Sequence, residues 1–444
     1  MLAPFAANNG FPADSKVYKL EKESELRCEV PWDGQLTVKL LEGVAEIFGT
    51  EIAQGQELHY RGGDKFAVFT WYGATVEITG QPEVSYVADE TPMVSYVNTH
   101  AVLEARRQSA REASSVDGGA AGEETQGPRT IIVGPTDSGK STLCKILLTY
   151  AARLGWKPTL VDLDIGQGQI SIPGTIAATL VDKPVDPIEG YEMESPLVYF
   201  YGHVSPSENP DLYRTQVEQL ASMLERRFAG SAEYRNAGAV INAMGWVESL
   251  GYELLLHAIE TFRIDVVLVI GQERLFSQLS SQFHGRTRPD GSRIDVVKLN
   301  KSGGVVNRNP KHRQRTRTSR VREYFYGIAG DLSPHAMTVS FADVQIYRIG
   351  GGPKAPSSAL PVGAQSHADP IKVTHVSISK DLTHAVLGIS YAASAEQLLS
   401  SNVAGFIYVT EVDTMKRTLT YVAPSPGPLP NNLLLAGSLM WVEH

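Results

Sequence analysis

Cysteine and long apolar runs are scarce in this sequence. Cys28 and Cys144 are the only cysteines among 444 residues, and they lie far apart without metal-ligand spacing. Neither a disulfide framework nor a zinc site is therefore predicted, and the low cysteine count is consistent with a reducing compartment. Apolar runs such as VVLVIG at 266–271 fall far short of the roughly 20 residues that cross a bilayer, and the N-terminus lacks a basic start and an apolar core. We expect no membrane association and no secretory route.

Positive charge is also in deficit. The formal net charge is −9 at pH 7, which argues against a protein that coats nucleic acid non-specifically, because phosphate contacts need Lys and Arg. A net negative charge is still compatible with a local basic patch. The hydrophobic share of 42% and the charged share of 20% are ordinary for globular proteins, so we expect a folded chain of two or three domains.

The first part of the chain has the pattern of a β domain. Short alternating stretches such as LTVKLLEG and TVEITG fill residues 17–90, between Gly, Asp and Gln. They predict a small antiparallel β-sandwich or barrel, which we place at 1–97. The spacing turns helical over 93–114, and 115–127 is small, acidic and Gly-rich. We predict a linking helix and a mobile loop at 98–127.

The middle of the chain reads as an α/β domain. A buried strand, RTIIVG at 129–134, runs into a Gly-rich turn and then a helix at 140–155. Strand and helix patterns alternate from there, which predicts a parallel sheet covered by helices on both faces. We place this domain at 128–330. Residues 331–444 return to strand patterns with Pro-rich turns and predict a small β-rich C-terminal domain.

The turn after the first strand of the α/β domain is a phosphate-binding loop. GPTDSGKST satisfies G-x-x-x-x-G-K-[ST] between a strand and a helix, as a P-loop requires. Backbone N–H groups can wrap the phosphates, Lys140 can reach the β and γ oxygens, and the Ser141 hydroxyl can hold Mg²⁺. The predicted nucleotide-binding residues are Gly134, Pro135, Thr136, Asp137, Ser138, Gly139, Lys140, Ser141 and Thr142.

The sequence favours ATP over GTP. A GTPase would carry an aspartate at the end of an N-K-x-D motif that reads guanine. The segment that begins at Asn300 reads N-K-S-G, so Gly303 stands where the carboxylate would be. ATP is therefore the predicted nucleotide.

Two carboxylates follow the next predicted strand. Asp162 and Asp164 stand two residues apart in VDLDIGQGQ, so their side chains share a strand face. In a neighbouring parallel strand, a carboxylate here reaches Mg²⁺ and the γ-phosphate, where it can hold a metal-bound water or take a proton from an attacking hydroxyl. The alternative for either residue is an acid that only caps backbone N–H groups.

A basic run lies near the end of the α/β domain. Residues 308–322 carry six Arg and one Lys without an acid. Such a run forms either a solvated helix face or nucleic-acid patch, or a lid whose arginines stabilise charge on a transferring phosphoryl group. Arg308, Arg313 and Arg317 are five and four residues apart, so on a helix they would lie near one face.

Taken together, these features resemble the Clp-one family, the eukaryotic polynucleotide 5′-hydroxyl kinases that form the ATP-binding subunit of pre-mRNA cleavage factor II. The likeness covers essentially the whole chain. The segments that carry it besides the P-loop and the aspartates are GVAEIFGTE (43–51), FTWYGATVEI (69–78), TPMVSYVNTH (91–100), SIPGT (171–175), INAMGW (241–246), KSGGVV (301–306), the Arg-rich stretch ending in EYFYG, and VAGFI (403–407).

The resemblance implies roles for single residues. Lys140, Asp164, Arg308 and Arg313 would be catalytic, with Asp164 activating the RNA 5′-hydroxyl and the arginines acting from a lid. Ser141, Asp162 and Asp164 would hold Mg²⁺. Gln167 belongs to the family's D-x-D-x-G-Q block and would contact substrate.

The family's T-x-G-W clasp, which holds the end of the RNA, falls on 243–246, with Gly245 and Trp246 as substrate-binding residues. Ala243 replaces the threonine of the pattern, so the contact of that hydroxyl is absent. Trp246 can still stack on a base, an interaction worth about 1–3 kcal/mol. Without the resemblance, an ordinary core tryptophan would be the simpler interpretation.

The implied function is an ATP-dependent RNA 5′-hydroxyl kinase in mRNA 3′-end cleavage and polyadenylation, with tRNA splicing as a second process in which it would act. RNA with a free 5′-hydroxyl and other cleavage subunits would be its partners, and the nucleus its location. The alternative is an ATP-binding scaffold subunit without turnover. A small-molecule or nucleoside kinase would share the P-loop chemistry but would explain neither the flanking β domains nor the basic lid.

Overall fold

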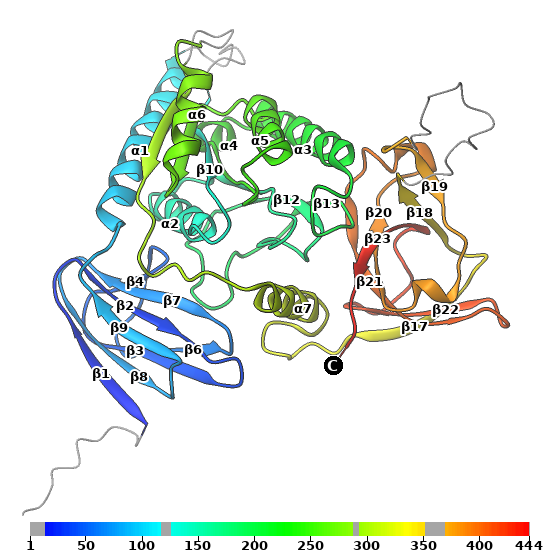
Figure 1. The fold of residues 1–444 in the computed structure, drawn as a ribbon, viewed down its shortest axis with the longest axis horizontal. Coiled ribbons are helices and arrows are strands. Elements are labelled where there is room, and N and C mark those ends of the chain that lie inside the picture. The colour runs from blue at the N-terminus through cyan, green and yellow to red at the C-terminus, as the bar shows by residue number, and fades with distance from the viewer. Residues whose placement is uncertain (1–13, 117–125, 287–292, 351–368, 444) are drawn as a thin grey trace, which may run out of the picture.

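The computed structural model describes residues 14–116, 126–286, 293–350 and 369–443, and the predicted mobile loop lies largely outside these residues. Three bodies follow one another along the chain (Figure 1). They are an N-terminal β-sandwich, a central domain built on a mostly parallel sheet, and a β-rich C-terminal domain. The predicted fold class is thereby confirmed.

The N-terminal sandwich consists of two antiparallel sheets that enclose their own apolar core. Its strands alternate between core and solvent: in β3, Leu36, Val38 and Leu40 are buried and the polar residues between them are partly exposed. One sheet has the order β1 (Ser15–Leu20), β8 (Ala74–Thr79), β3 (Gln35–Gly43), β6 (Glu57–Arg61). The other has the order β5 (Thr50–Glu51), β4 (Glu46–Ile47), β7 (Lys65–Thr70), β2 (Ser24–Glu29), β9 (Val84–Ala88).

The central sheet has seven strands, and its middle strands are buried along their whole length. Both faces of the sheet are covered by helices, which explains the continuous apolar runs. The order is β13 (Leu197–Phe200), β12 (Thr175–Leu180), β11 (Thr159–Asp162), β14 (Ala239–Asn242), β10 (Arg129–Val133), β15 (Val266–Ile270), β16 (Asp295–Leu299). Strands β11, β14, β10, β15 and β16 run parallel. β12 is antiparallel to both of its neighbours, because the chain returns from β11 through the loop 163–174 and not through a crossover helix.

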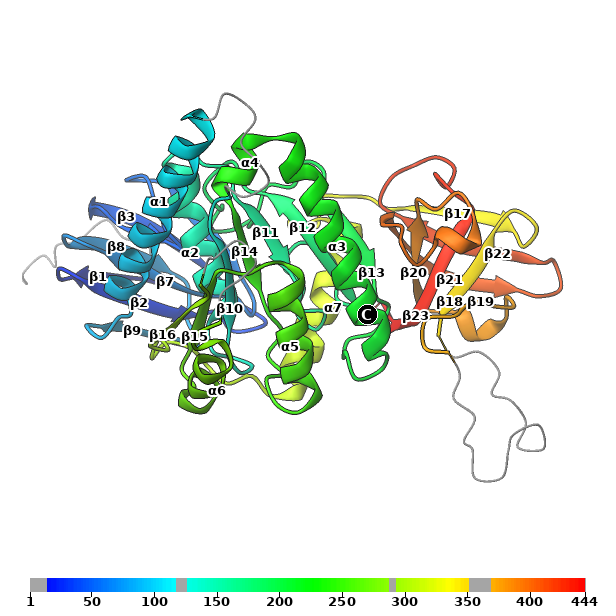
Figure 2. The ribbon, with the colours of Figure 1, turned by 90° about the horizontal axis from the view of Figure 1, so that it is seen from above.

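Helices pack on both sides of the central sheet, with α1 and α2 on one side and α3 and α5 on the other (Figure 2). The helices are α1 (Met93–Val116), α2 (Lys140–Arg153), α3 (Pro210–Gly230), α4 (Ala232–Ala237), α5 (Leu250–Thr261), α6 (Glu273–Phe283) and α7 (Pro310–Tyr326). In the described part of the chain, no helix combines the length and the apolar character that a bilayer span requires.

The C-terminal domain is one seven-stranded sheet with two short 3-10 turns, at Lys380–Leu382 and Ala395–Gln397. Its order is β17 (His335–Ser340), β22 (Thr418–Ala423), β21 (Val403–Asp413), β20 (Ala385–Ser390), β23 (Leu433–Met440), β18 (Gln345–Ile349), β19 (Val373–His375). The central apolar core continues into this domain through residues such as Phe406 and Trp441. The domain is therefore packed firmly against the central one.

Candidate functional site: a cavity between the N-terminal sandwich and the P-loop

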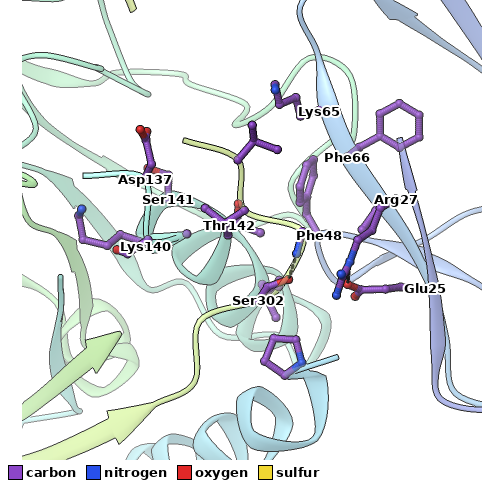
Figure 3. Close-up of a pocket in the computed structure, with 18 of the residues that line it drawn as sticks. Glu25, Arg27, Phe48, Lys65, Phe66, Asp137, Lys140, Ser141, Thr142 and Ser302 are labelled. Carbon is purple, nitrogen blue, oxygen red and sulfur yellow. Dashed lines mark hydrogen bonds and ion pairs between the residues drawn. The ribbon is translucent and has the colours of Figure 1, made fainter. Parts of the chain in front are cut away.

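A cavity of about 240 Å³ lies between the N-terminal sandwich and the P-loop. In Figure 3, the P-loop side chains lie on one side of the cavity and Glu25 and Arg27 on the other. Its lining comes from four parts of the chain: residues 136–142 with Asp164 and Gln167, the sandwich, the start of α1 at Met93 and Tyr96, and the segment that follows β16. The site is thus built from domains that are far apart in the sequence.

The P-loop closes one side of this cavity at the N-terminus of α2. Gly139 caps the helix with a φ of 94°, a left-handed conformation that glycine adopts without strain. Lys140 Nζ donates to the carbonyls of Gly134 at 3.1 Å and Pro135 at 2.9 Å, and burial lowers its pKa while Asp164 acts in the opposite direction. Residues 136–142 line the cavity, whereas Gly134 and Pro135 do not. Free N–H groups at a helix start and a buried lysine form a phosphate-binding arrangement.

The opposite side of the cavity is held in place by Arg27 of β2. Its guanidinium donates to Glu25 at 2.6 Å, to the Glu90 carbonyl at 2.6 Å and to the Tyr86 hydroxyl at 3.3 Å. Thr91 donates to the other oxygen of Glu25 at 2.9 Å. The arginine is only 8% exposed and each of its three nitrogens donates a hydrogen bond, so its side chain is held in one place.

The segment that follows β16 packs directly on Arg27. A Cβ on Gly304 would lie 2.7 Å from the arginine Cδ, and a Cβ on Gly303 would lie 3.1 Å from its Nη1. Val305 reaches the P-loop, since a Cβ on Gly139 would meet its methyl group at 3.2 Å. The two glycines therefore allow this segment to pass between the sandwich and the P-loop.

Asp164 lies at the centre of the predicted chemistry and lines the cavity. Its carboxylate accepts the Gly166 N–H at 3.1 Å. Burial raises the pKa of Asp164, and the nearby charge of Lys140 opposes that rise. A carboxylate whose affinity for a proton is raised suits the role of a base toward a hydroxyl group.

Asp162 has a different environment from its neighbour. One oxygen accepts the Asp164 N–H at 3.2 Å and the Asn242 side chain at 2.9 Å, and the other accepts the Gln169 N–H at 2.6 Å. Burial and the charge of Asp164 raise its pKa to about 7. Asp162 does not line the cavity, so its contacts are those of an acid that caps backbone groups and ties the loop to β14. Its role as a metal ligand stays a prediction.

The oxygens near the P-loop fit Mg²⁺. The Ser141 hydroxyl and the Asp164 carboxylate line the same cavity, and hard oxygen ligands are those that Mg²⁺ prefers. Among the described residues there is no cluster of three or more His, Cys, Asp or Glu side chains that could hold a metal ion alone. Mg²⁺ usually takes one or two protein ligands, and phosphate oxygens and water complete its shell.

The basic run forms α7, and its first turn contacts the P-loop. Asp137, at a φ of 56°, accepts the backbone N–H of Arg308 at 2.8 Å and the guanidinium of Arg313 at 2.8 Å. Although burial would raise the pKa of Asp137, these two donors hold it below its usual value. The Arg308 side chain donates to Gln167 at 3.2 Å. Both predicted lid arginines therefore meet at the P-loop.

The expectation that three arginines share one helical face was wrong. Asn309 caps α7 and Pro310 is its first residue, so Arg308 precedes the helix. Arg317 donates to Gln314 on its own helix, at 2.8 Å. Arg308 and Arg313 come together because both bind the same carboxylate and not because of helical spacing.

The predicted RNA clasp lies next to the P-loop but outside the cavity. A Cβ on Gly245 would lie 2.7 Å from the Thr136 Cα, and the Thr136 hydroxyl donates to the Gly245 carbonyl at 3.4 Å. Trp246 is half-buried and packs against the central core. Ala243 is buried at the end of β14. The close contact explains why glycine is needed at 245.

Comparison with known proteins assigns all three domains. The central domain matches the family model "mRNA cleavage and polyadenylation factor CLP1 P-loop" over 134–327. The "N-terminal beta-sandwich domain of polyadenylation factor" matches 19–110, and "Pre-mRNA cleavage complex II protein Clp1" matches 332–443. An Arabidopsis thaliana protein named "Protein CLP1 homolog" is 55% identical over 97% of this chain and 95% of its own length. This chain belongs to the Clp1 family.

Other Clp1 relatives extend the comparison. The human "Polyribonucleotide 5'-hydroxyl-kinase Clp1" is 43% identical over 96% of each chain. A solved structure of a Clp1p–Pcf11p complex matches with a TM-score of 0.81 over 98% of this chain and 99% of that one, at 23% identity. The fold of the Clp1 family is therefore shared along the whole chain.

Sequence reasoning missed most of the cavity's N-terminal side. Arg27 and Lys65 lie on sandwich strands, where a charged residue in an alternating pattern is normally solvent-facing. The sequence also predicted that Asp137 contributes to the P-loop only through its backbone, and it did not predict the contacts of its carboxylate with Arg308 and Arg313. The paired glycines of KSGGVV were a usable signal, because adjacent glycines often mark a close backbone approach.

Proposed function

We propose that this chain is an ATP-dependent polyribonucleotide 5′-hydroxyl kinase that acts with other subunits of the pre-mRNA cleavage machinery. The observation that carries the proposal is that Lys140, Asp164 and Arg308 line one cavity at the P-loop. The names of the 43%-identical Clp1 relatives give this site its substrate class. The Clp1p–Pcf11p complex supports association with other cleavage-factor subunits.

ATP would lie with its phosphates on the P-loop and its base toward the N-terminal sandwich. Phe48 and Phe66 give the sandwich side an apolar surface, next to the polar pair Glu25 and Arg27. An apolar cavity with a few fixed polar groups is the usual form of a nucleotide-base site. When bound beside Ser141 and Asp164, Mg²⁺ would neutralise charge on the phosphates.

Phosphoryl transfer would follow from these positions. The 5′-hydroxyl oxygen of RNA attacks the γ-phosphorus, the bond to the β–γ bridging oxygen breaks, and ADP leaves with that electron pair. Asp164 takes the hydroxyl proton, since burial raises the affinity of its carboxylate for a proton. Arg308 and Arg313 exchange their contacts with Gln167 and Asp137 for the transferring group and stabilise its charge.

RNA would approach from the side of the predicted clasp. Gly245 contacts the P-loop at Thr136, so Trp246 lies close to the phosphates while outside the nucleotide cavity. Action in the nucleus, on pre-mRNA and also in tRNA splicing, belongs to the same proposal. A scaffold that binds ATP without turnover is the alternative, and Ala243 in place of the clasp threonine is the observation that favours it.

Transfer of labelled γ-phosphate from ATP to a short single-stranded RNA with a 5′-hydroxyl tests the proposal. Wild type should label the RNA, and Lys140→Ala and Asp164→Asn should not. Asp182→Asn changes an exposed aspartate and is the matched control. The kinase proposal fails if wild type binds ATP and labels nothing, and Ala243→Thr would then be assayed in the same way to test the scaffold.

A further inference from the structure

Helix α7 contacts all three domains and lies between the two β domains (Figures 1 and 2). Its C-terminal half is fixed in the C-terminal domain. Phe325 is buried and stacks on Trp441 with ring centroids 5.8 Å apart, and the Tyr324 hydroxyl accepts the Phe406 N–H at 2.9 Å. The N-terminal half of α7 carries Arg313, Arg315 and Arg317, and it makes contacts of its own.

One of those contacts is Trp32, in the turn between β2 and β3 of the sandwich. The guanidinium of Arg315 lies 4.3 Å from the centroid of the indole ring, within cation–π range. His312 packs edge-on against the same ring at 5.1 Å. Positions 312 and 315 are three residues apart and therefore neighbours on one side of the helix.

The turn between β6 and β7 also packs against Trp32. A Cβ on Gly63 would meet the indole ring at 2.7 Å, and one on Gly62 would meet the Trp32 carbonyl at 2.1 Å. The two turns are joined by backbone hydrogen bonds between Val30 and Asp64 at 2.9 Å and between Gly63 and Val30 at 3.0 Å. The two glycines thus allow this turn to pack directly against Trp32.

The first turns of α7 are therefore held at two points: by Trp32 of the sandwich, and by Asp137 of the P-loop through Arg308 and Arg313. Lys65 follows the glycine turn directly and lines the nucleotide cavity. One turn of the sandwich thus joins the nucleotide side of the cavity to the helix that carries the arginines.

We propose that Trp32 is a positioning residue for phosphoryl transfer, which holds α7 on the N-terminal sandwich and thereby places Arg308 and Arg313 over the P-loop. The proposal rests on the kinase function proposed above. It predicts that losing the indole ring slows transfer while ATP binding and the fold stay intact, because Trp32 does not line the nucleotide cavity.

The test compares Trp32→Ala, Trp32→Phe and the control Tyr72→Ala, an aromatic residue of the same sandwich that is 81% exposed. Trp32→Ala should lower kcat by about 2- to 30-fold, the range that a cation–π contact covers. The affinity for a non-hydrolysable ATP analogue and the unfolding temperature should equal those of the control. Trp32→Phe keeps an aromatic ring and should recover most of kcat. Arg315→Ala added to Trp32→Ala should cause little further loss.

Hydrogen exchange of α7 gives a second readout that does not depend on turnover. Amides in the first two turns of the helix should exchange faster in Trp32→Ala than in Tyr72→Ala, with the ATP analogue bound. The inference is overturned if the exchange rates and kcat of Trp32→Ala match those of the control. It is also overturned if the loss of activity comes from weaker nucleotide binding or from a lower unfolding temperature. If wild type labels no RNA, the kinase proposal fails, and the exchange measurement alone then decides whether Trp32 holds the helix.

Discussion

Gly304 packs so closely on Arg27 that one added methyl group is predicted to weaken nucleotide binding. A Cβ on Gly304 would lie 2.7 Å from Cδ and 2.8 Å from Nε of the arginine. Arg27 cannot readily give way, because it donates to three acceptors in the sandwich. The segment that carries residue 304 therefore has to retreat by about 0.7 Å to reach 3.4 Å, where ordinary contact begins.

Overpacking of this kind typically costs about 1–3 kcal/mol. Both partners line the nucleotide cavity, so we expect the cost to appear in binding, as the segment and the sandwich move apart. Gly304→Ala should then bind a non-hydrolysable ATP analogue about 5- to 150-fold more weakly, measured by isothermal titration calorimetry.

Three variants control this experiment. Gly230→Ala, at the end of α3, has no atom within 4 Å of the new methyl group and should change nothing. In Gly303→Ala the nearest atom to the new methyl group is the terminal Nη1 of Arg27, at 3.1 Å, so the effect should be smaller. In an Arg27→Ala background, Gly304→Ala should cost little more than Arg27→Ala alone. The reasoning is refuted if Gly304→Ala matches Gly230→Ala in affinity and unfolding temperature, or if its penalty persists without the arginine side chain.

Other predictions concern charge and stability. Burial lowers the pKa of His100 from 6.5 to about 4. Below pH 6.5 the unfolded chain therefore binds a proton that the folded chain does not, and the free energy of unfolding should fall by about 3 kcal/mol as the pH drops towards 4. Urea unfolding of His100→Gln should show a smaller loss over that pH range, and an identical loss would contradict this. Arg129 is 4% exposed and donates to Glu225 and to a backbone carbonyl. Glu225→Gln removes the counter-charge of this buried guanidinium and should lower the free energy of unfolding in urea by about 3–5 kcal/mol. Arg129→Met leaves only the half-exposed Glu225 carboxylate and should cost less. Burial raises the pKa of Asp164. As the solution is acidified, the rate of RNA labelling should therefore begin to fall at a higher pH than it would with an ordinary aspartate as the base. A rate that stays flat down to pH 4 would argue against Asp164 as the base.

The sequence alone determined the P-loop, the order of the domains and the β or α/β character of each. These features are local: a strand, a Gly-rich turn and a helix are encoded within 129–155, and alternation of apolar residues marks the sandwich strands. The start of α7 was also encoded locally, because Asn309 and Pro310 form a helix-start signal that places Arg308 outside the helix. The helical-face prediction overlooked that signal.

Only the tertiary structure decided what faces the P-loop. Arg27 and Lys65 lie on strands whose pattern does not distinguish solvent from the wall of a cavity. Strand spacing alone does not distinguish Asp162 from Asp164, and only the family resemblance gave Asp164 the catalytic role. Packing against Asn242 engages the first, while the second lines the cavity. Trp32 meets Arg315 across nearly 300 residues of chain. Contacts at such separations depend on how completed elements pack, and no local periodicity carries that information.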